Sequence, residues 1–367
     1  MNRAVATIVF ALLACAERTP ITLSPTLVHD GEQVSILSAS PTAHTLYATP
    51  TRVSRPLRRG LQQTLGIDWE EVDTLAPDVA DLGTLQELAA IAGNAYALNP
   101  GRSKNWYDLP DYWNATLPIG DSSETMMRGH VFVDTRDNAT VVISIKGTTL
   151  PFTGPTSGED RRNDNLMFSC CCARSKSVCG CFGKKWTCDT NCVEDALTED
   201  RLFYNFGINL FNNVTYLYPQ ARIWIVGHSL GGALAALLGA TFGAPTVAFA
   251  APGDRLAAQR LHLPTHAPIT HVVHTADPIP YGTCTICARA GFALETRCHL
   301  GKTITFDSVE RLGWSQDLRH HPMRVFVDQV LHAGGMWKDV DGVEREVPLA
   351  RVEEDCEDCY KWTFKDT

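Results

Sequence analysis

The run 222–239 constrains the fold of this chain more than any other part of the sequence. It begins with RIWIV (222–226), an apolar and β-branched segment that predicts a buried strand. It continues with GHSLG (227–231) and GALAALL (232–238), whose small and apolar residues predict a closely packed helix. A strand that turns sharply into a helix needs glycines where backbones pass close together, so Ser229 is expected at the apex of a tight turn.

The turn at Ser229 matches the G-x-S-x-G pattern, in which a serine hydroxyl is the nucleophile of acyl transfer. The N-terminus of the following helix favours negative charge near that hydroxyl. A serine hydroxyl is a weak nucleophile at neutral pH, so it needs a base, and the base needs a carboxylate to orient it. In chains with this turn the three residues follow in the order serine, acid, histidine.

Asp277 is the candidate acid. It lies in HTADPIP (274–280), just beyond a predicted strand over 270–275, where a carboxylate can turn toward the serine. The alternative is a loop aspartate that hydrogen-bonds its own turn before Pro278.

The candidate base comes from the histidines that follow Asp277, which are His299, His320, His321 and His332. The segment DLRHHP (317–322) is the best candidate, since it is polar and precedes a predicted helix. Spacing alone leaves His320 and His321 both open, and solvated loop histidines without a role are the alternative.

A serine hydrolase also needs two donors for the oxyanion. The residue after the nucleophile supplies one backbone N–H, which here belongs to Leu230. The second donor comes from a loop after an earlier strand, and KGT (146–148) occupies such a loop. Thr148 can offer both its N–H and its hydroxyl there.

The rest of the chain predicts strands that alternate with helices. Residues 17–84 contain prolines at 20, 25, 41, 50, 56 and 77 and predict a loosely structured lead-in. The other predicted elements are helices over 85–98 and 196–217, a hairpin of strands 129–134 and 140–145, and strands 246–250 and 270–275. This alternation predicts an α/β-hydrolase fold with a mostly parallel central sheet over 85–362, interrupted by a cysteine-rich insert at about 153–192.

The N-terminal residues predict a targeting signal. Residues 4–16 form an apolar stretch behind Arg3, and ACA (14–16) has the small-x-small form that signal peptidase accepts. The stretch is 13 residues long, whereas a membrane-spanning helix needs roughly 17 to 25. Residues 1–16 therefore predict a signal peptide in preference to a short signal anchor, and entry into the secretory pathway.

The cysteines fit the same compartment. The chain has 13, and removal of Cys15 with the leader leaves an even twelve, which predicts disulfides in an oxidising environment. The alternative is a zinc cluster around Cys179-x-Cys181 and the pair Cys188 and Cys192. We expect the segment 170–192 to be disulfide-stapled and to lie over or beside the active-site mouth, because it falls between the oxyanion loop and the serine turn.

Three sequons, at Asn114, Asn138 and Asn213, are compatible with N-glycosylation in that pathway. Asn138 has an alternative reading as the turn residue of the predicted hairpin.

The formal charge is −9, from 32 basic and 41 acidic residues. This acidic balance argues against a nucleic-acid partner, because nucleic-acid binding needs basic surface. Acyl transfer to water through a serine ester requires no metal and no cofactor. No obligate protein partner is evident from the sequence.

These features resemble the autophagy-related fungal lipases of the class 3 lipase superfamily. The segments that carry the resemblance are IKGTT (145–149), DNLMFSCCCAR (164–174), the cysteine cluster 179–192, ARIWIVGHSLGGALAALLG (221–239), PTVAFAAPGDRLAA (245–258), HTADPIPYGTC (274–284) and DCEDCYKW (355–362). They run from about residue 85 to residue 362, and the cysteine-rich insert is far more specific than the serine turn.

The resemblance implies Ser229 as nucleophile, Asp277 as triad acid and His321 as base, with Thr148 as an oxyanion residue. It implies hydrolysis of membrane phospholipid, with phosphatidylserine as one substrate, and of triacylglycerol, for lysis of autophagic or other vesicle membranes inside the vacuole. It also implies a single-pass membrane protein of the endoplasmic reticulum and the multivesicular body or endosome, and the segment 4–16 is shorter than such an anchor.

Two other functions compete with this one. A secreted soluble carboxylesterase would share the triad but show no preference for a lipid interface. A catalytically silent glycoprotein on a hydrolase scaffold would keep the sheet without turnover, although the triad residue types occur in the required order.

Overall fold

The computed structural model describes residues 34–35, 47–56, 69–120, 127–136, 139–149, 156–199 and 202–366. A seven-stranded sheet lies at its centre, in the order β11-β10-β9-β8-β6-β5-β4. In sequence order these strands are β4 (Trp113–Ile119), β5 (Gly129–Asp134), β6 (Thr140–Ile145), β8 (Arg222–His228), β9 (Thr246–Phe249), β10 (Ile269–His274) and β11 (Lys302–Phe306). Neighbours from β6 to β11 are parallel, and β4 and β5 add antiparallel pairs at one edge, which confirms the predicted mostly parallel α/β-hydrolase sheet.

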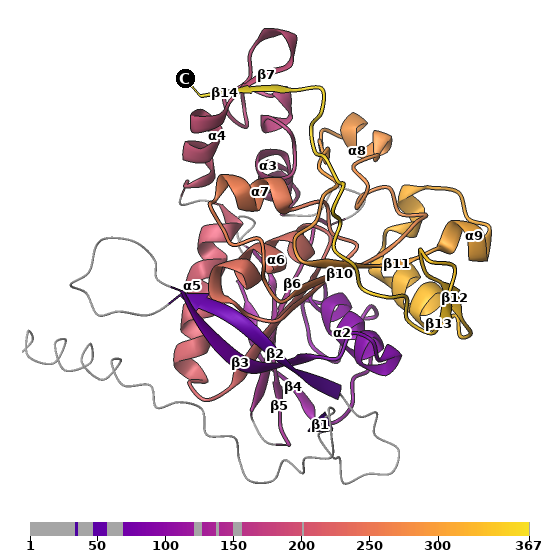
Figure 1. The fold of residues 1–367 in the computed structure, drawn as a ribbon. Coiled ribbons are helices and arrows are strands. Elements are labelled where there is room, and N and C mark those ends of the chain that lie inside the picture. The colour runs from indigo at the N-terminus through magenta and orange to yellow at the C-terminus, as the bar shows by residue number, and fades with distance from the viewer. Residues whose placement is uncertain are drawn as a thin grey trace, which may run out of the picture.

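Helices cover both faces of this sheet (Figure 1). The helices of the described ranges are α2 (Leu82–Asn94), α3 (Ser157–Met167), α4 (Thr190–Leu197), α5 (Phe203–Leu217), α6 (Leu230–Phe242), α7 (Arg255–Arg260), α8 (Thr285–Arg289), α9 (Ser308–Leu312) and α10 (Met323–Val325), which continues as a π-helical turn over Phe326–Leu331. Short 3-10 turns occur at Cys172–Arg174, Lys184–Trp186 and Leu318–His320.

The sheet is buried on both faces because its strands alternate between two apolar cores. In β8, Ile223 and Ile225 belong to the core shared with α5 and α6, whereas Trp224 and Val226 belong to the core shared with α2 and the 323–331 segment. A strand buried on both faces reads as a continuous apolar run, which explains why RIWIV was a clear signal.

The predicted loose lead-in is wrong for its described part. β2 (Tyr47–Pro56) and β3 (Trp69–Pro77) form a long antiparallel hairpin, and β1 (Val34–Ser35) pairs with the start of β2. The hairpin packs on the body, since Trp224 Nε1 donates to the carbonyl of Leu75 at 2.9 Å. Prolines suggest breaks, but they are tolerated where a strand has an open edge. The paired residues of β2 and β3 lie 13 to 29 positions apart in the chain, so the pairing leaves no local pattern.

The predicted helix over 196–217 is two helices. Asp189 caps α4 by accepting from the backbone N–H of Cys192, and α4 ends at Leu197. The start of α5 is held by a tertiary contact, because Phe203 N donates to Asn163 Oδ1 on α3 at 2.9 Å. A cap supplied from 40 residues away cannot be read from helical periodicity.

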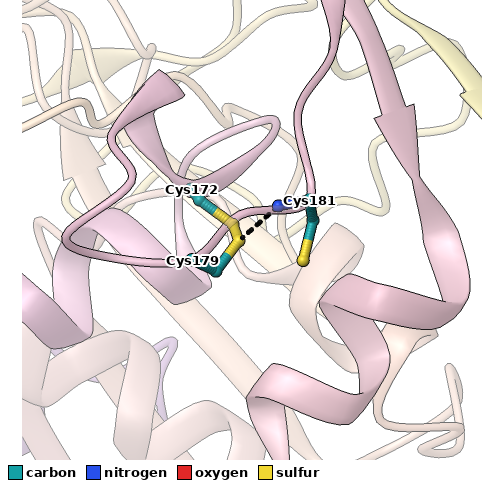
Figure 2. A group of neighbouring side chains, drawn as sticks. All are labelled: Cys172, Cys179 and Cys181. Atoms are coloured by element: carbon teal, nitrogen blue, oxygen red, sulfur yellow. Dashed lines mark hydrogen bonds between the residues drawn. A yellow bond between two sulfur atoms is a disulfide. The ribbon is translucent and has the colours of Figure 1, made fainter.

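Six disulfides join all twelve cysteines of the described part of the chain. They are Cys170–Cys359, Cys171–Cys188, Cys172–Cys179, Cys181–Cys192, Cys284–Cys287 and Cys298–Cys356. This confirms the predicted stapling. Cys172, Cys179 and Cys181 lie close together (Figure 2), but each sulfur is already in a disulfide, so the zinc alternative is wrong because a zinc ligand must be a thiolate.

The C-terminal strap, which we define as residues 351–365, crosses the molecule and fastens the insert to the body (Figure 1). It is bonded to the body through Cys356 and to the insert through Cys359. Its last strand, β14 (Thr363–Lys365), pairs with β7 (Thr187–Asp189) of the insert, and a small hairpin of β12 (Trp337–Lys338) and β13 (Glu344–Arg345) precedes it.

None of the helices in the described ranges has both the length and the apolar character that a bilayer span requires. The predicted signal segment 1–16 lies outside the described residues.

Candidate active site

Ser229 lies at the tight turn between β8 and α6, as the glycine pattern predicts. It has φ 59° and ψ −131°, a conformation that is strained for a residue with a Cβ. A Cβ on Gly227 would lie 2.2 Å from the carbonyl oxygen of Gly231, and one on Gly231 would lie 2.2 Å from that of Ile145. Glycine is therefore required on both sides of the serine, and Ser229 itself is buried at the carboxyl end of the central strand.

Asp277 and His321 form a buried pair beside this turn. His321 Nδ1 lies 2.7 Å from Asp277 Oδ2, and the other carboxylate oxygen accepts from the N–H of Ile279 at 3.0 Å. Burial alone would raise the pKa of Asp277, but the neighbouring imidazole and its hydrogen bond outweigh burial and hold the pKa below its usual value. The carboxylate is therefore charged and fixes the orientation of the His321 ring.

His321 and not His320 contacts the acid. The ring of His320 stacks on Trp314 with centroids 4.3 Å apart, away from Asp277. The backbone carbonyls of both residues are held by buried histidines of the parallel strands, since His274 Nε2 lies 3.1 Å from the His320 oxygen and His228 Nε2 lies 3.0 Å from the His321 oxygen.

His321 contacts His228, the residue that precedes the serine. The rings of His228 and His321 have centroids 4.6 Å apart. In the described ranges no hydrogen bond joins Ser229 Oγ to His321 Nε2. Catalytic hydrogen bonds often tighten only when substrate binds, so the role of His321 as base stays a prediction.

The two remaining candidate histidines, His299 and His332, form hydrogen bonds with groups other than Asp277. His299 Nδ1 lies 2.9 Å from Glu353 Oε1 in the C-terminal strap. His332 Nδ1 lies 2.7 Å from the carbonyl of Val327 in the preceding turn. Neither ring contacts Asp277.

The predicted oxyanion residue Thr148 lies in the loop after β6. Thr148 is buried, and its Oγ1 lies 2.6 Å from Asp164 Oδ2 on α3. Burial raises the pKa of Asp164 to about 8, against the opposing effect of the Thr148 hydrogen bond. Leu230 is the first residue of α6, so its N–H lies at the helix N-terminus next to Ser229.

A charged pair supports this loop. Lys146 Nζ lies 3.4 Å from Asp160 Oδ2, and the same carboxylate oxygen accepts from Thr156 Oγ1 at 2.8 Å. Both side chains of the pair are buried, and burial lowers the pKa of Lys146 although Asp160 opposes the change. The α3 half of the insert therefore touches the site, while a place for the cysteine segment beside the mouth stays a prediction.

Sequence reasoning assigned no role to Asp164, Tyr96 or His228. Tyr96 Oη lies 2.8 Å from His228 Nδ1 and accepts from the N–H of Gly147 at 3.1 Å. Asp164 opens the segment DNLMF, which was part of the resemblance, and His228 lies inside the serine pattern, so both had a signal. Tyr96 lies just after α2, more than 130 residues before Ser229, and no sequence pattern indicated a role for it at the site.

Two of the three predicted glycosylation residues can be located. Asn114 and Asn213 are exposed, on β4 and α5, and Asn138 lies outside the described residues. Glycosylation at these positions stays a prediction.

Comparison with known proteins places this chain among lipases. Residues 208–284 match the family model described as Lipase (class 3). A relative from Cryptococcus neoformans var. neoformans serotype D (strain B-3501A), described as "Putative lipase ATG15", is 41% identical over 367 residues, which cover 81% of this chain and 70% of the relative. The relative of that description from Saccharomyces cerevisiae (strain ATCC 204508 / S288c) is 40% identical over 321 residues, which cover 81% of this chain and 59% of that one.

Solved lipase structures are more distant. Lip2 lipase from Yarrowia lipolytica is 18% identical with a TM-score of 0.36, and the match covers 60% of this chain and 77% of that one. A mono- and diacylglycerol lipase from Aspergillus oryzae is 16% identical with a TM-score of 0.37, over 66% of this chain and 94% of that one. By its match to these relatives, the chain belongs to the ATG15 family of class 3 lipases and is a lipase.

Proposed function

We propose that Ser229, Asp277 and His321 form the catalytic triad of a lipase that cleaves acyl esters of membrane phospholipids and of triacylglycerol. The observation that carries the proposal is the buried contact of 2.7 Å between His321 Nδ1 and Asp277 Oδ2, next to a serine in a strained strand-to-helix turn. This pairing leaves Nε2 as the ring nitrogen that can serve the serine.

Acylation begins when Ser229 Oγ attacks the carbonyl carbon of the ester, while His321 Nε2 takes the hydroxyl proton. The carbonyl oxygen becomes an oxyanion, which the N–H of Leu230 and the donors of Thr148 stabilise. When the tetrahedral intermediate collapses, the bond to the alcohol oxygen breaks, and His321 returns the proton to that leaving oxygen. The products of this half are the acyl-serine and a lysolipid or diacylglycerol.

Deacylation repeats the same steps with water. His321 takes a proton from water as the water oxygen attacks the acyl carbon, and then returns it to Ser229 Oγ as the fatty acid leaves. Asp277 remains a carboxylate throughout, which fits the lowered pKa of its buried side chain. The acid stabilises the imidazolium that forms twice in each turnover.

We assign the substrate class from the family. The relatives carry the name lipase, and the proposal extends this to phospholipid and neutral lipid at vesicle surfaces in the vacuole, reached through the secretory pathway. Six disulfides and the exposed sequons at Asn114 and Asn213 support an oxidising, glycosylating route. In the same proposal, residues 1–16 direct the chain into this pathway as a signal peptide or a short signal anchor.

The test is lipid release by the purified protein. Wild type and Ser229→Ala are incubated with mixed phospholipid vesicles and with a triacylglycerol emulsion at acidic and neutral pH, and released fatty acids are identified by mass. Ser229→Ala should lose release from every lipid, whereas Ser315→Ala, a change of an exposed loop serine, should keep it. Turnover that survives Ser229→Ala would reject the assigned nucleophile.

The same preparation separates the two rivals. A plain carboxylesterase would hydrolyse short soluble esters and show no rise in rate when long-chain esters form a dispersed phase. A silent glycoprotein would not react with a fluorophosphonate probe, whereas the proposed lipase should be labelled at Ser229 and at no residue in Ser229→Ala.

A further inference from the structure

Tyr96 contacts two catalytic segments at once, although it lies outside the triad. Its Oη accepts a hydrogen bond from the backbone N–H of Gly147 at 3.1 Å and lies 2.8 Å from His228 Nδ1. Gly147 precedes the oxyanion residue Thr148, and His228 precedes the nucleophile Ser229. One phenol oxygen therefore joins the oxyanion loop to the serine turn.

The contact continues from His228 to the base. His228 Nε2 lies 3.0 Å from the carbonyl oxygen of His321. A carbonyl can only accept, so Nε2 must carry the proton of the ring. Burial lowers the pKa of His228 to about 3, which keeps the ring neutral and leaves Nδ1 as an acceptor.

These constraints define the direction of every hydrogen bond. Gly147 N–H donates to Tyr96 Oη, Tyr96 O–H donates to His228 Nδ1, and His228 Nε2–H donates to the His321 carbonyl. Burial raises the pKa of the Tyr96 hydroxyl, so the phenol keeps the proton that this arrangement requires. The donor and the acceptor of each of the three hydrogen bonds are therefore fixed, and no tautomer needs to change during the reaction.

The packing at this junction is close. A Cβ on Gly147 would lie 2.6 Å from Tyr96 Oη and 2.2 Å from the His228 carbonyl oxygen. The edges of the Tyr96 and His228 rings meet, with centroids 5.7 Å apart. A small shift of the phenol would therefore move the oxyanion loop and the serine turn together.

We propose that Tyr96 is a positioning residue. It fixes the oxyanion loop, the nucleophile turn and the base segment relative to one another through its hydrogen bonds with Gly147 and His228 and the bond from His228 to the His321 carbonyl. The inference rests on the proposed triad, because the relative placement of Thr148, Ser229 and His321 affects the rate only if these residues act together in catalysis. It predicts that loss of the hydroxyl slows the chemical step while substrate binding stays unchanged.

The first test is Tyr96→Phe, with Tyr204→Phe as the matched control. Tyr204 is also a buried tyrosine, and its Oη lies 2.7 Å from Thr241 Oγ1, away from the site. On a short soluble ester, Tyr96→Phe should lower kcat by about tenfold to a hundredfold with KM little changed, because two hydrogen bonds are lost. Tyr204→Phe should keep kcat; equal kcat in the two variants would overturn the proposal.

The second test changes His228 and covers the case that Tyr96→Phe fails to fold. His228→Gln keeps an acceptor for Tyr96 and a donor for the His321 carbonyl, whereas His228→Met of similar length has neither. Glutamine should retain most of kcat and methionine should lose it, and Tyr96→Phe should add little further loss on the methionine background. Equal activity of the two His228 variants would overturn the proposal.

Ser229→Ala in the same assay keeps the two proposals apart. If Ser229→Ala abolishes turnover but Tyr96→Phe does not lower kcat, the positioning role is wrong and the triad stands. If turnover survives Ser229→Ala, the assigned nucleophile is wrong, and the positioning role that rests on it is overturned as well.

Discussion

Three buried histidines in the described ranges pair with a carboxylate, and two of them, His321 and His299, differ in what their second nitrogen does. His321 Nδ1 lies 2.7 Å from Asp277, and in the described ranges its Nε2 makes no hydrogen bond. His299 Nδ1 lies 2.9 Å from Glu353, and its Nε2 lies 3.2 Å from the carbonyl of Ala251. A ring with acceptors at both nitrogens is held as a cation, whereas a ring with one nitrogen available can pick up and release a proton.

The surroundings of the second pair agree with a structural role. Glu353 also accepts from Thr303 Oγ1 at 2.9 Å and from the His299 backbone N–H at 2.9 Å, and Arg255 lies 3.8 Å from its carboxylate. The ring of His271, which lies 3.2 Å from Asp254, has its centroid 4.6 Å from that of His299. This network fastens the C-terminal strap beside its disulfide at Cys356. A histidine and a carboxylate in contact therefore do not identify a catalytic base by themselves.

The largest expected effect separates the two histidines by activity. His321→Gln should lower kcat on the order of 10³-fold or more, because the proposed proton acceptor is lost. His299→Gln should leave kcat close to wild type, since its ring contacts the strap and not the acid. Steady-state kinetics on a soluble ester measures both. A loss of kcat in His299→Gln that matches His321→Gln would break the comparison.

A smaller effect concerns the stability of the strap and its dependence on pH. Burial alone would lower the pKa of His299, but Glu353 outweighs it and raises the pKa above the usual 6.5. Burial alone would raise the pKa of Glu353, but His299 and its other donors hold it at about 2. The two shifts describe one ion pair.

The sign of the pH dependence follows from these directions. The raised pKa of His299 stabilises the fold below its unfolded value and loses this effect as the pH rises through the folded value. The lowered pKa of Glu353 stabilises the fold above about 4.5 and loses this effect only toward about 2. Glu353→Gln should therefore cost about 1 to 3 kcal/mol at about pH 5.5 and less at about pH 9. Urea unfolding of both proteins at the two pH values measures this, and a cost that rises with pH would contradict the ion pair.

The smallest effect concerns a carboxyl group with no histidine beside it. Asp164 contacts the Thr148 hydroxyl, and its pKa is raised to about 8, whereas Asp277 and Glu353 are held ionised by imidazoles. Below about pH 8 the proton of Asp164 can satisfy Thr148 Oγ1, which leaves the threonine hydroxyl free to donate to the oxyanion.

Asp164→Asn should therefore change kcat little at acidic pH and should reduce the decline of activity above about pH 8 by a few-fold. The kcat–pH profiles of both proteins measure this. A large loss at acidic pH in Asp164→Asn would mean that the carboxylate, and not the protonated acid, serves Thr148.

The elements that local sequence predicted well are those whose pattern is short and repeated. The hairpin 129–134 and 140–145 matches β5 and β6, because its strands are adjacent in the chain and strongly β-branched. The serine turn was readable because its glycines are required by contacts within five residues and by one neighbouring strand. The acid loop followed a predicted strand, so Asp277 could be named before its partner was known.

Sequence alone determined the α/β sheet, the turn at Ser229, the order of serine, acid and histidine, and an oxidised cysteine set, since periodicity, glycine placement and composition are local properties. Only the tertiary structure decided the pairing of the cysteines, the β2–β3 hairpin, the pairing of His321 rather than His320 with Asp277, and the contacts of Tyr96. Each of these joins segments that are distant in the chain, and their free energy comes from burial and hydrogen bonds that exist only after folding.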